Sequence, residues 1–176
     1  MRKTTALALI ATAVVALGCG SGATDNSSSS DSDGAAKGEE KAAKTAKIGQ
    51  PARDGKFEFT VKSSKCGVTK VGDSVLGEQA QGQFCLVTLN VKNIGKEAQM
   101  FDGSSQKAYA ADGTEYSADT GAAIYANKNA ETFLNDINPG NQVTGVVVFD
   151  IPMKVKLAKL ELHDSPFSGG VTVALS

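Results

Sequence analysis

The sequence predicts an antiparallel β-sandwich, and three observations lead to this prediction. About seven short segments alternate between apolar and polar residues, as strands covered on one face do. Glycine, proline and short Asp-Gly or Asn-Pro-Gly sequences separate these segments and favour turns. No long amphipathic helical pattern interrupts them, so two sheets packed face to face are the expected architecture.

The chain begins with the pattern of an export signal over residues 1–18. Two basic residues precede an apolar run of about 12 residues, too short for a transmembrane helix, which needs roughly 20. The run ends at Gly18-Cys19, which resembles the cleavage site of bacterial lipoproteins, although Ala16 and Leu17 depart from that family's usual residues. The resemblance implies that Cys19 becomes the acylated first residue of the mature protein and attaches it to a lipid bilayer. An ordinary secretory signal with an incidental cysteine is the alternative.

Residues 19–52 are expected to form a disordered spacer after the lipidated cysteine. This segment is rich in serine, glycine, alanine, lysine and glutamate and has almost nothing apolar to bury. About 30 flexible residues have a root-mean-square reach of roughly 30 Å. The spacer would therefore hold a folded domain, residues 53–176, away from the membrane.

The charge of the mature chain argues against one class of partner. Residues 1–18 contain two basic and no acidic residues, so their removal leaves 16 basic and 19 acidic residues. The remaining chain is slightly acidic and lacks the concentrated basic face that nucleic-acid binding requires. We therefore expect no nucleic-acid partner.

The cysteine count predicts a disulfide in the folded domain. With Cys19 assigned to the lipid, Cys66 and Cys85 remain as an even pair in an exported protein, where disulfides persist. A bridge that closes a loop of about 20 residues stabilises a fold by roughly 3 kcal/mol. Two buried free thiols are the alternative.

The first half of the domain contains the clearest strand. Residues 56–64 alternate and predict a first strand, whereas glycines punctuate residues 68–83 and favour a loop, with a short strand at 68–71. In the central strand, residues 83–95, one face carries the apolar row Cys85, Val87, Leu89 and Val91. We expect this row to lie in the core.

The second half predicts further strands. Residues 106–116 form a hairpin in which Asp112-Gly113 suits a type I′ turn. Residues 122–130 favour a helical turn, and the Asn-Pro-Gly-Asn sequence at 138–141 predicts a turn. The remaining strands are expected at 142–150, at 154–163 with a β-bulge where the apolar phase slips, and at 171–175.

Four motifs resemble, in order, those of one bacterial family. They are the strand ending Val-Lys-Asn-Ile-Gly at 85–95, Asp-Gly-Thr-Glu-Tyr at 112–116, Ile-Asn-Pro-Gly at 137–140 and Val-Val-Phe-Asp-Ile-Pro at 147–152. The family is a lipoprotein domain of unknown function, common in Gram-positive bacteria. Its immunoglobulin-like sandwich is similar to that of a secreted mycobacterial immunogenic antigen. The resemblance implies this fold and a place on the outer face of the cytoplasmic membrane of a Gram-positive bacterium. It carries over no catalytic residues, because the family has no established activity.

Catalytic and metal chemistry have weak support in the sequence. His163 is the single histidine, and although Asp164 follows it, no nucleophile motif completes a Ser-His-Asp arrangement, so we do not expect an enzyme. Met100 and Met153 would have to join His163 in a copper site, but no cluster of these residues occurs. The loop acids lack the calcium pattern of EF-hands, so we expect no metal site and no cofactor.

The expected function is a membrane-tethered module that binds a protein or cell-wall partner through its loops. The longest irregular region, 111–141, mixes aromatic and adaptable polar side chains of the kind found at interfaces. The candidate partner-binding residues are Tyr116, Asp119, Tyr125, Lys128 and Asp136. A small-ligand or metal (copper or calcium) carrier at the cell surface is the alternative function.

Overall fold

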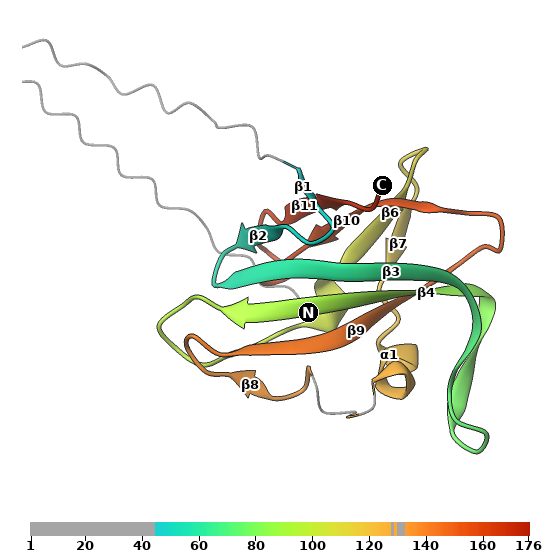
Figure 1. Cartoon of the computed structure of the whole chain (residues 1–176), viewed down its shortest axis with the longest axis horizontal. Helices are drawn as coiled ribbons and strands as arrows, with labels where there is room; N and C mark the ends of the chain where they lie inside the picture. The colour runs from blue at the N-terminus through green and yellow to red at the C-terminus, as the bar shows by residue number, and fades with distance from the viewer. Residues whose placement is uncertain (1–44, 128, 130–132) are drawn as a thin grey trace, which may run out of the picture. The chain divides into compact units, whose positions relative to one another are not determined.

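The computed structural model describes residues 45–127, 129 and 133–176. The predicted signal peptide, Cys19 and most of the predicted spacer lie outside the described residues, as does Lys128. The described residues belong to one compact unit and form two main sheets packed face to face (Figure 1). The predicted β-sandwich is confirmed.

Within the described residues, the domain consists of three sheets and two short helical segments. The five-stranded sheet has the spatial order β1 (Ala46–Lys47), β11 (Val171–Ala174), β10 (Leu157–Leu162), β6 (Lys107–Ala110) and β7 (Glu115–Ser117). The four-stranded sheet has the order β2 (Pro51–Asp54), β3 (Phe57–Gly72), β4 (Gly77–Asn93) and β9 (Gln142–Ile151). A small ladder joins β5 (Gln99–Met100) to β8 (Asp136–Ile137), and the chain also forms η1 (Gly103–Ser105) and α1 (Thr120–Ala126). Strand pairs are antiparallel except β1 with β11.

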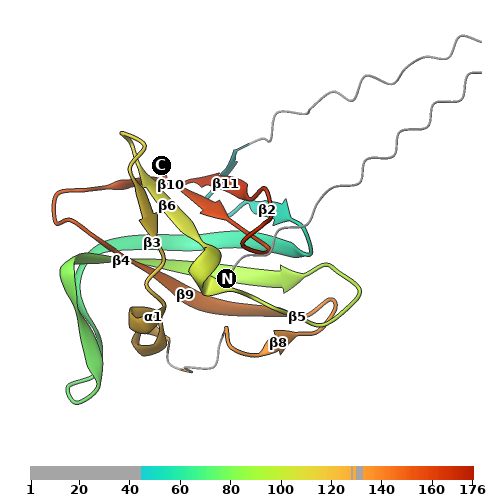
Figure 2. The same ribbon diagram turned by 180° about the vertical axis from the view of Figure 1, so that it is seen from behind.

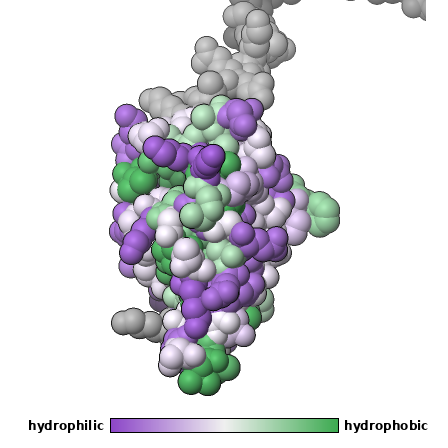
Figure 3. All heavy atoms as spheres, turned by 90° about the vertical axis from the view of Figure 1, so that its right-hand side faces the viewer, coloured by the Kyte–Doolittle hydropathy of each residue, from purple (hydrophilic) through white to green (hydrophobic). Residues whose placement is uncertain are grey.

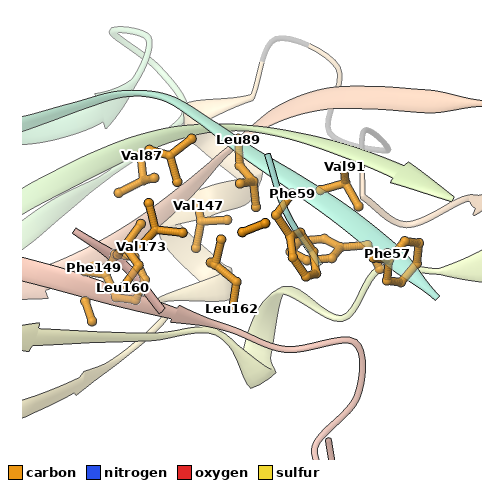
Figure 4. Close-up of a cluster of buried hydrophobic side chains, with 14 of the residues drawn as sticks. Phe57, Phe59, Val87, Leu89, Val91, Val147, Phe149, Leu160, Leu162 and Val173 are labelled. Atoms are coloured by element: carbon orange, nitrogen blue, oxygen red, sulfur yellow. The ribbon is translucent and has the colours of Figure 1, made fainter. Parts of the chain in front are cut away.

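The core lies between the two main sheets, as the alternating patterns predict. The inner row of β4 is the predicted one, and each of its members is at most 1% exposed: Cys85, Val87, Leu89 and Val91. Phe59 of β3 and Phe149 of β9 extend this row within the same sheet, and Leu160 of β10 and Val173 of β11 come from the opposite sheet (Figure 4). The predicted bulge is also present, since the register of β10 against β6 shifts between Leu157 and Lys159.

A second cluster lies on the outer face of the four-stranded sheet. We call it the helix-side cluster; its buried members are Val71, Phe84, Ala122 and Val148. Helix α1 packs here against β9 and the far part of the β3–β4 hairpin, which bends around it (Figure 1). Val148 alternates with Val147 and Phe149 of the inter-sheet core, so it points to the outer face of β9, which α1 covers.

The short strand predicted at 68–71 is confirmed as part of β3, but the prediction of a loop over the rest of residues 68–83 is wrong. These residues form the outer part of the long β3–β4 hairpin, whose register shifts near Val68. Gly72 has a φ of +93° and closes the hairpin tip, where a β-carbon would come within 2.3 Å of the Leu76 carbonyl oxygen. The glycines therefore shape a bent hairpin and do not end the strands.

The predicted disulfide between Cys66 and Cys85 is confirmed. Cys85 is fully buried in the core, whereas Cys66 lies on the exposed side of β3. The bridge joins β3 to β4 between the pairs Lys65–Leu86 and Val68–Phe84, where the hairpin leaves the sandwich. It therefore connects the projecting part of the hairpin covalently to the central strand.

Two further predictions need correction. The predicted spacer at 19–52 includes β1 and half of β2, whose Ala46 and Ala52 are buried, so the fold begins before the predicted domain at 53–176. These strands are short and bury only alanines, which leaves no apolar alternation to detect.

The Asp112-Gly113 turn is not type I′, because the Gly113 amide donates to the Ala110 carbonyl and Gly113 is thus the last turn residue. A three-residue loop with its final glycine at φ +88° results.

Candidate binding site

An apolar pocket of about 250 Å³ lies between η1, α1 and the segment leading into β8. Its lining side chains are mainly apolar, with a few polar groups. The lining residues are Met100, Phe101, Asp102, Gly103, Ser104, Thr120, Ala123, Ile124, Asn127, Phe133 and Leu134. Such a combination of apolar walls and a few polar groups is typical of binding pockets.

The floor of the pocket is fixed by an aromatic cluster. Phe101 is 2% exposed, and its ring centroid lies 4.6 Å from that of Phe133. On its other side Phe101 packs edge-on against Phe57 and Phe59, with centroid separations of 6.2 and 6.1 Å. The floor is therefore continuous with the core, and aromatic packing holds it in one arrangement.

Polar contacts of Asp102 form one wall. The Asp102 carboxylate accepts hydrogen bonds from the Ser104 amide at 2.9 Å, from the Ser104 hydroxyl at 2.6 Å and from the Ser105 hydroxyl. Burial raises the pKa of Asp102, but the hydrogen bonds from Ser104 and Ser105 outweigh burial and leave the pKa below its ordinary value. The wall thus carries an ionised carboxylate whose hydrogen bonds fix η1.

Helix α1 forms the opposite wall and also protects the free edge of β9. The Asp119 carboxylate accepts from the Ala122 amide at 2.9 Å and caps the helix, while the Asp119 amide donates to the Val148 carbonyl at 2.7 Å. At the other end, the Asn127 side chain accepts from the Val146 amide and donates to the Val146 carbonyl, at 2.8 and 2.9 Å. These bonds occupy backbone groups that would otherwise be open to another strand.

The rim of the pocket exposes large apolar side chains. Met100 is 57% exposed, Ile124 is 49% exposed and Leu134 is 59% exposed. Three such side chains around a buried aromatic floor form an apolar patch with a hollow at its centre. Clustered apolar exposure of this kind is characteristic of surfaces that bind a partner.

Of the five residues predicted to bind a partner, the four that the structure describes do not gather in one place. Tyr125 is on α1 and 40% exposed, and Asp119 is the helix cap beside the pocket. Tyr116 is in β7 and packs against the inter-sheet core, while Asp136 is in β8, in a separate polar groove with Lys92. Lys128 lies outside the described residues.

The sequence reasoning missed the pocket itself. Met100 was considered only as a copper ligand, and Phe101, Phe133 and Leu134 were assigned to no site. A signal was present, because four large apolar residues occur in two segments that fit no strand pattern. Their meeting depends on the β5–β8 ladder, which pairs Gln99 with Ile137.

A second, polar pocket of about 420 Å³ lies on the outer face of the five-stranded sheet. Here His163 Nε2 is 3.0 Å from Glu161 Oε1, and His163 Nδ1 is 3.3 Å from the Ser168 hydroxyl. The Ser168 hydroxyl donates to the Ser165 carbonyl at 3.0 Å, and a β-carbon on Gly170 would clash with the His163 ring. These contacts hold the loop after β10 against the sheet, so they account for the histidine structurally.

The remaining groups of the polar pocket are paired with one another. Tyr109 donates to Glu115 at 3.0 Å, and Lys107 lies 3.1 Å from the same carboxylate. Burial, followed by the Glu115 hydrogen bond and the charges of Glu161 and Glu115, raises the pKa of Tyr109 to about 12. Hydrogen bonds from Lys107 and Tyr109 lower the pKa of Glu115. The network is neutral or ion-paired at physiological pH.

Within the part of the chain that the structure describes, no group of three or more His, Cys, Asp and Glu side chains is placed to hold a metal ion. No described helix has the length and apolar character needed to cross a bilayer.

The chain is similar in sequence to one protein of Bacillus subtilis. The uncharacterized protein YxkC of Bacillus subtilis (strain 168) is 32% identical over 115 residues, covering 61% of this chain and 63% of that protein. The chain thus spans less than two thirds of this relative's length.

Two solved structures resemble the fold. The secreted protein MPT63 of Mycobacterium tuberculosis superposes with a TM-score of 0.54 at 16% identity, covering 74% of this chain and 95% of MPT63. The yjhA protein of Bacillus subtilis gives 0.53 at 15% identity, covering 75% of this chain and 100% of that one. At these identities the likeness concerns the fold alone.

One family spans almost the whole described domain. The domain of unknown function DUF4352 matches residues 46–173, from β1 into β11. The match begins at the strand that the structure adds to the predicted domain. The chain therefore belongs to the DUF4352 family.

Proposed function

We propose that this protein is an extracytoplasmic, lipid-anchored binding module whose apolar pocket accepts an apolar side chain of a protein partner. The observation that supports this proposal most strongly is the ring of exposed Met100, Ile124 and Leu134 around the buried ring of Phe101. Truncating an apolar anchor that fills such a pocket typically costs about 2 kcal/mol or more of binding free energy.

The size of the pocket favours a side chain over a carried small molecule. A volume of about 250 Å³ is below the roughly 300–1,000 Å³ of drug-sized ligand sites. A cavity of about 150 Å³ already holds a benzene molecule. The pocket therefore suits one or two aliphatic side chains and is smaller than the sites that hold drug-sized ligands.

The anchoring part of the proposal rests on the sequence. The Gly18-Cys19 sequence after an apolar run supports acylation of Cys19, and the polar composition of the following residues supports a spacer. The disulfide between Cys66 and Cys85 is consistent with an oxidising compartment outside the cytoplasm. The domain would then meet partners at the outer face of the cytoplasmic membrane.

The proposal can be tested with two methionines of similar exposure. Met100 lines the pocket and is 57% exposed, whereas Met153 is 63% exposed and lies in the β9–β10 connection. A photoreactive methionine analogue is placed at one position at a time in the full chain, and the cells are irradiated. We expect a protein adduct from position 100 and at least about tenfold less from position 153.

A second change in the same chain identifies the pocket as the cause. Ile124→Asp places a charge on the rim and should lower the position-100 adduct at least about tenfold, since a desolvated carboxylate opposes apolar docking. Equal adducts from both methionines, or an adduct that Ile124→Asp leaves unchanged, would contradict the proposal.

A further inference from the structure

We infer that the partner of the apolar pocket is a second copy of this chain, which inserts the tip of its β3–β4 hairpin, Val75 and Leu76. This inference rests on the proposed function, because it names the occupant of the same pocket. It is carried by a projecting apolar tip on the same molecule as an apolar hollow of matching size.

The hairpin tip exposes two branched aliphatic side chains. Val75 is 85% exposed and Leu76 is 64% exposed. Both are apolar, and they belong neither to the inter-sheet core nor to the helix-side cluster. In Figure 3 an apolar group forms the lower end of the molecule, at the height where Figure 1 shows the tip. Contiguous apolar groups at the end of a projection are costly to leave in water and indicate a contact.

The tip is held in one conformation. Asp73 Oδ1 accepts from the amides of Val75 and Leu76 at 2.7 and 2.6 Å, and the Asp73 amide donates to the Leu76 carbonyl at 2.7 Å. Backbone hydrogen bonds from Leu76 and Val75 lower the pKa of Asp73, which is therefore ionised at neutral pH. A preformed tip loses little conformational entropy when it docks.

The pocket and the tip match in chemistry and size. Two aliphatic side chains face outward at the tip, and the pocket of about 250 Å³ has an aromatic floor and an aliphatic rim. The tip does not fill its own pocket, since both of its side chains remain exposed. Helix α1 lies between them, because Ala122 and Ala126 pack in the helix-side cluster with Val71 of the hairpin, while Ile124 lines the pocket.

The arrangement also permits a closed dimer. The tip, α1 and β8 lie along the lower side of the domain in Figure 1, and Figure 2 shows the same from behind. Because the tip lies on the same side of the domain as α1, which forms one wall of the pocket, a two-fold axis between two copies can bring each tip to the other's pocket. Such a reciprocal contact buries both tips at once and ends at two copies.

Paired cysteines in two differently tagged full chains test this contact in cells. One chain carries Ser74→Cys at the tip, which leaves Val75 and Leu76 intact. The other carries Gly103→Cys on the pocket wall, where a β-carbon meets nothing within 4 Å. A mild oxidant should then link the two chains in a disulfide-bonded heterodimer.

A matched control and a disruptive change make the test specific. Gly169→Cys, where a β-carbon also meets nothing within 4 Å, replaces Gly103→Cys and should give at least about tenfold less heterodimer. Adding Leu76→Asp to the Ser74→Cys chain should reduce the heterodimer about tenfold or more, while Leu76→Met retains it.

The outcomes separate the second-copy contact from the binding module. Equal linkage through positions 103 and 169, or no heterodimer, would overturn the second-copy contact. If the photoreactive analogue at position 100 then forms an adduct with a different protein, the binding module stands and only the identity of the partner is wrong. If position 100 forms no adduct either, both proposals fail.

Discussion

The inter-sheet core and the helix-side cluster differ in size and in how they are built. The core joins long alternating strands from both sheets, whereas the helix-side cluster has four buried members, supplied by α1, β9 and the hairpin. Burial of apolar area is the main stabilising contribution, so the core accounts for most of the stability. The smaller cluster instead positions α1 and thereby one wall of the pocket.

The difference indicates a division of roles within one domain. Elements that bind partners commonly belong to the less stable parts of a fold, where local opening costs little. Here the pocket wall and the hairpin tip both lie in the part that the small cluster supports, and the disulfide links that part to β4. The following predictions test whether the two regions can be perturbed separately.

The largest effect is expected in the inter-sheet core. Phe59 is fully buried, so Phe59→Ala should lower the free energy of unfolding by about 4 kcal/mol. Val71→Ala, in the helix-side cluster, should cost roughly 1.5 kcal/mol, because two methylene equivalents are lost. Chemical denaturation of the full chain measures both values, and equal costs would remove the distinction between the regions.

Loss of the disulfide should come next. Replacing Cys66 and Cys85 by Ala is expected to destabilise the chain by about 3 kcal/mol, since the bridge closes a loop with a sequence separation of 19. Denaturation of the double variant beside the wild-type chain gives the value. A cost well under about 1 kcal/mol would mean that the long hairpin needs no covalent support.

Removing the contact between α1 and the β9 edge should have a smaller, local effect. Asn127→Ala deletes two hydrogen bonds to Val146, at an expected cost of about 1–2 kcal/mol. Hydrogen exchange should become faster at the Val146 amide while the amides of Leu89 and Val91 keep their protection. Faster exchange throughout β4 would show that α1 is coupled to the core.

The smallest effect concerns pH at the hairpin tip. The pKa of Asp73 is lowered from its ordinary value of 3.8. The stability that its ionised carboxylate gives the tip is therefore complete above that value and is lost as the pH falls through the lowered pKa. NMR of the full chain should then show the Val75 and Leu76 amides losing their hydrogen bonds on acidification. Asp73→Asn, which keeps an acceptor oxygen but does not titrate, should abolish this step.

The sequence predicts the core well because period-two alternation reports burial directly. The inner row of β4, the outward Val148 and the bulge in β10 follow from spacing alone. The sequence is less informative where strands do not cover the core. The sequence pattern predicted a loop for the outer hairpin, because glycines at 72, 77 and 82 interrupt it and its apolar residues divide between the helix-side cluster and the exposed tip.

The candidate site was harder to predict for the same reason. Tyr125 and Asp119 were placed in a binding region from composition, and the structure locates both on or beside α1. The pocket floor could not be predicted, since Phe101 and Phe133 are 32 residues apart in the sequence and are brought together by the short β5–β8 ladder. Two-residue strands carry no periodic signal.

Native-state hydrogen exchange of the full chain tests the separation of the two regions most directly. We expect the β4 amides of the inner row, from Cys85 to Val91, to exchange only through global unfolding. The Ala123 amide of α1, which donates to Asp119, should exchange through a local opening that costs at least about 2 kcal/mol less. If the α1 amides instead exchange with the same free energy as those of β4, the domain opens as one unit and the account is contradicted.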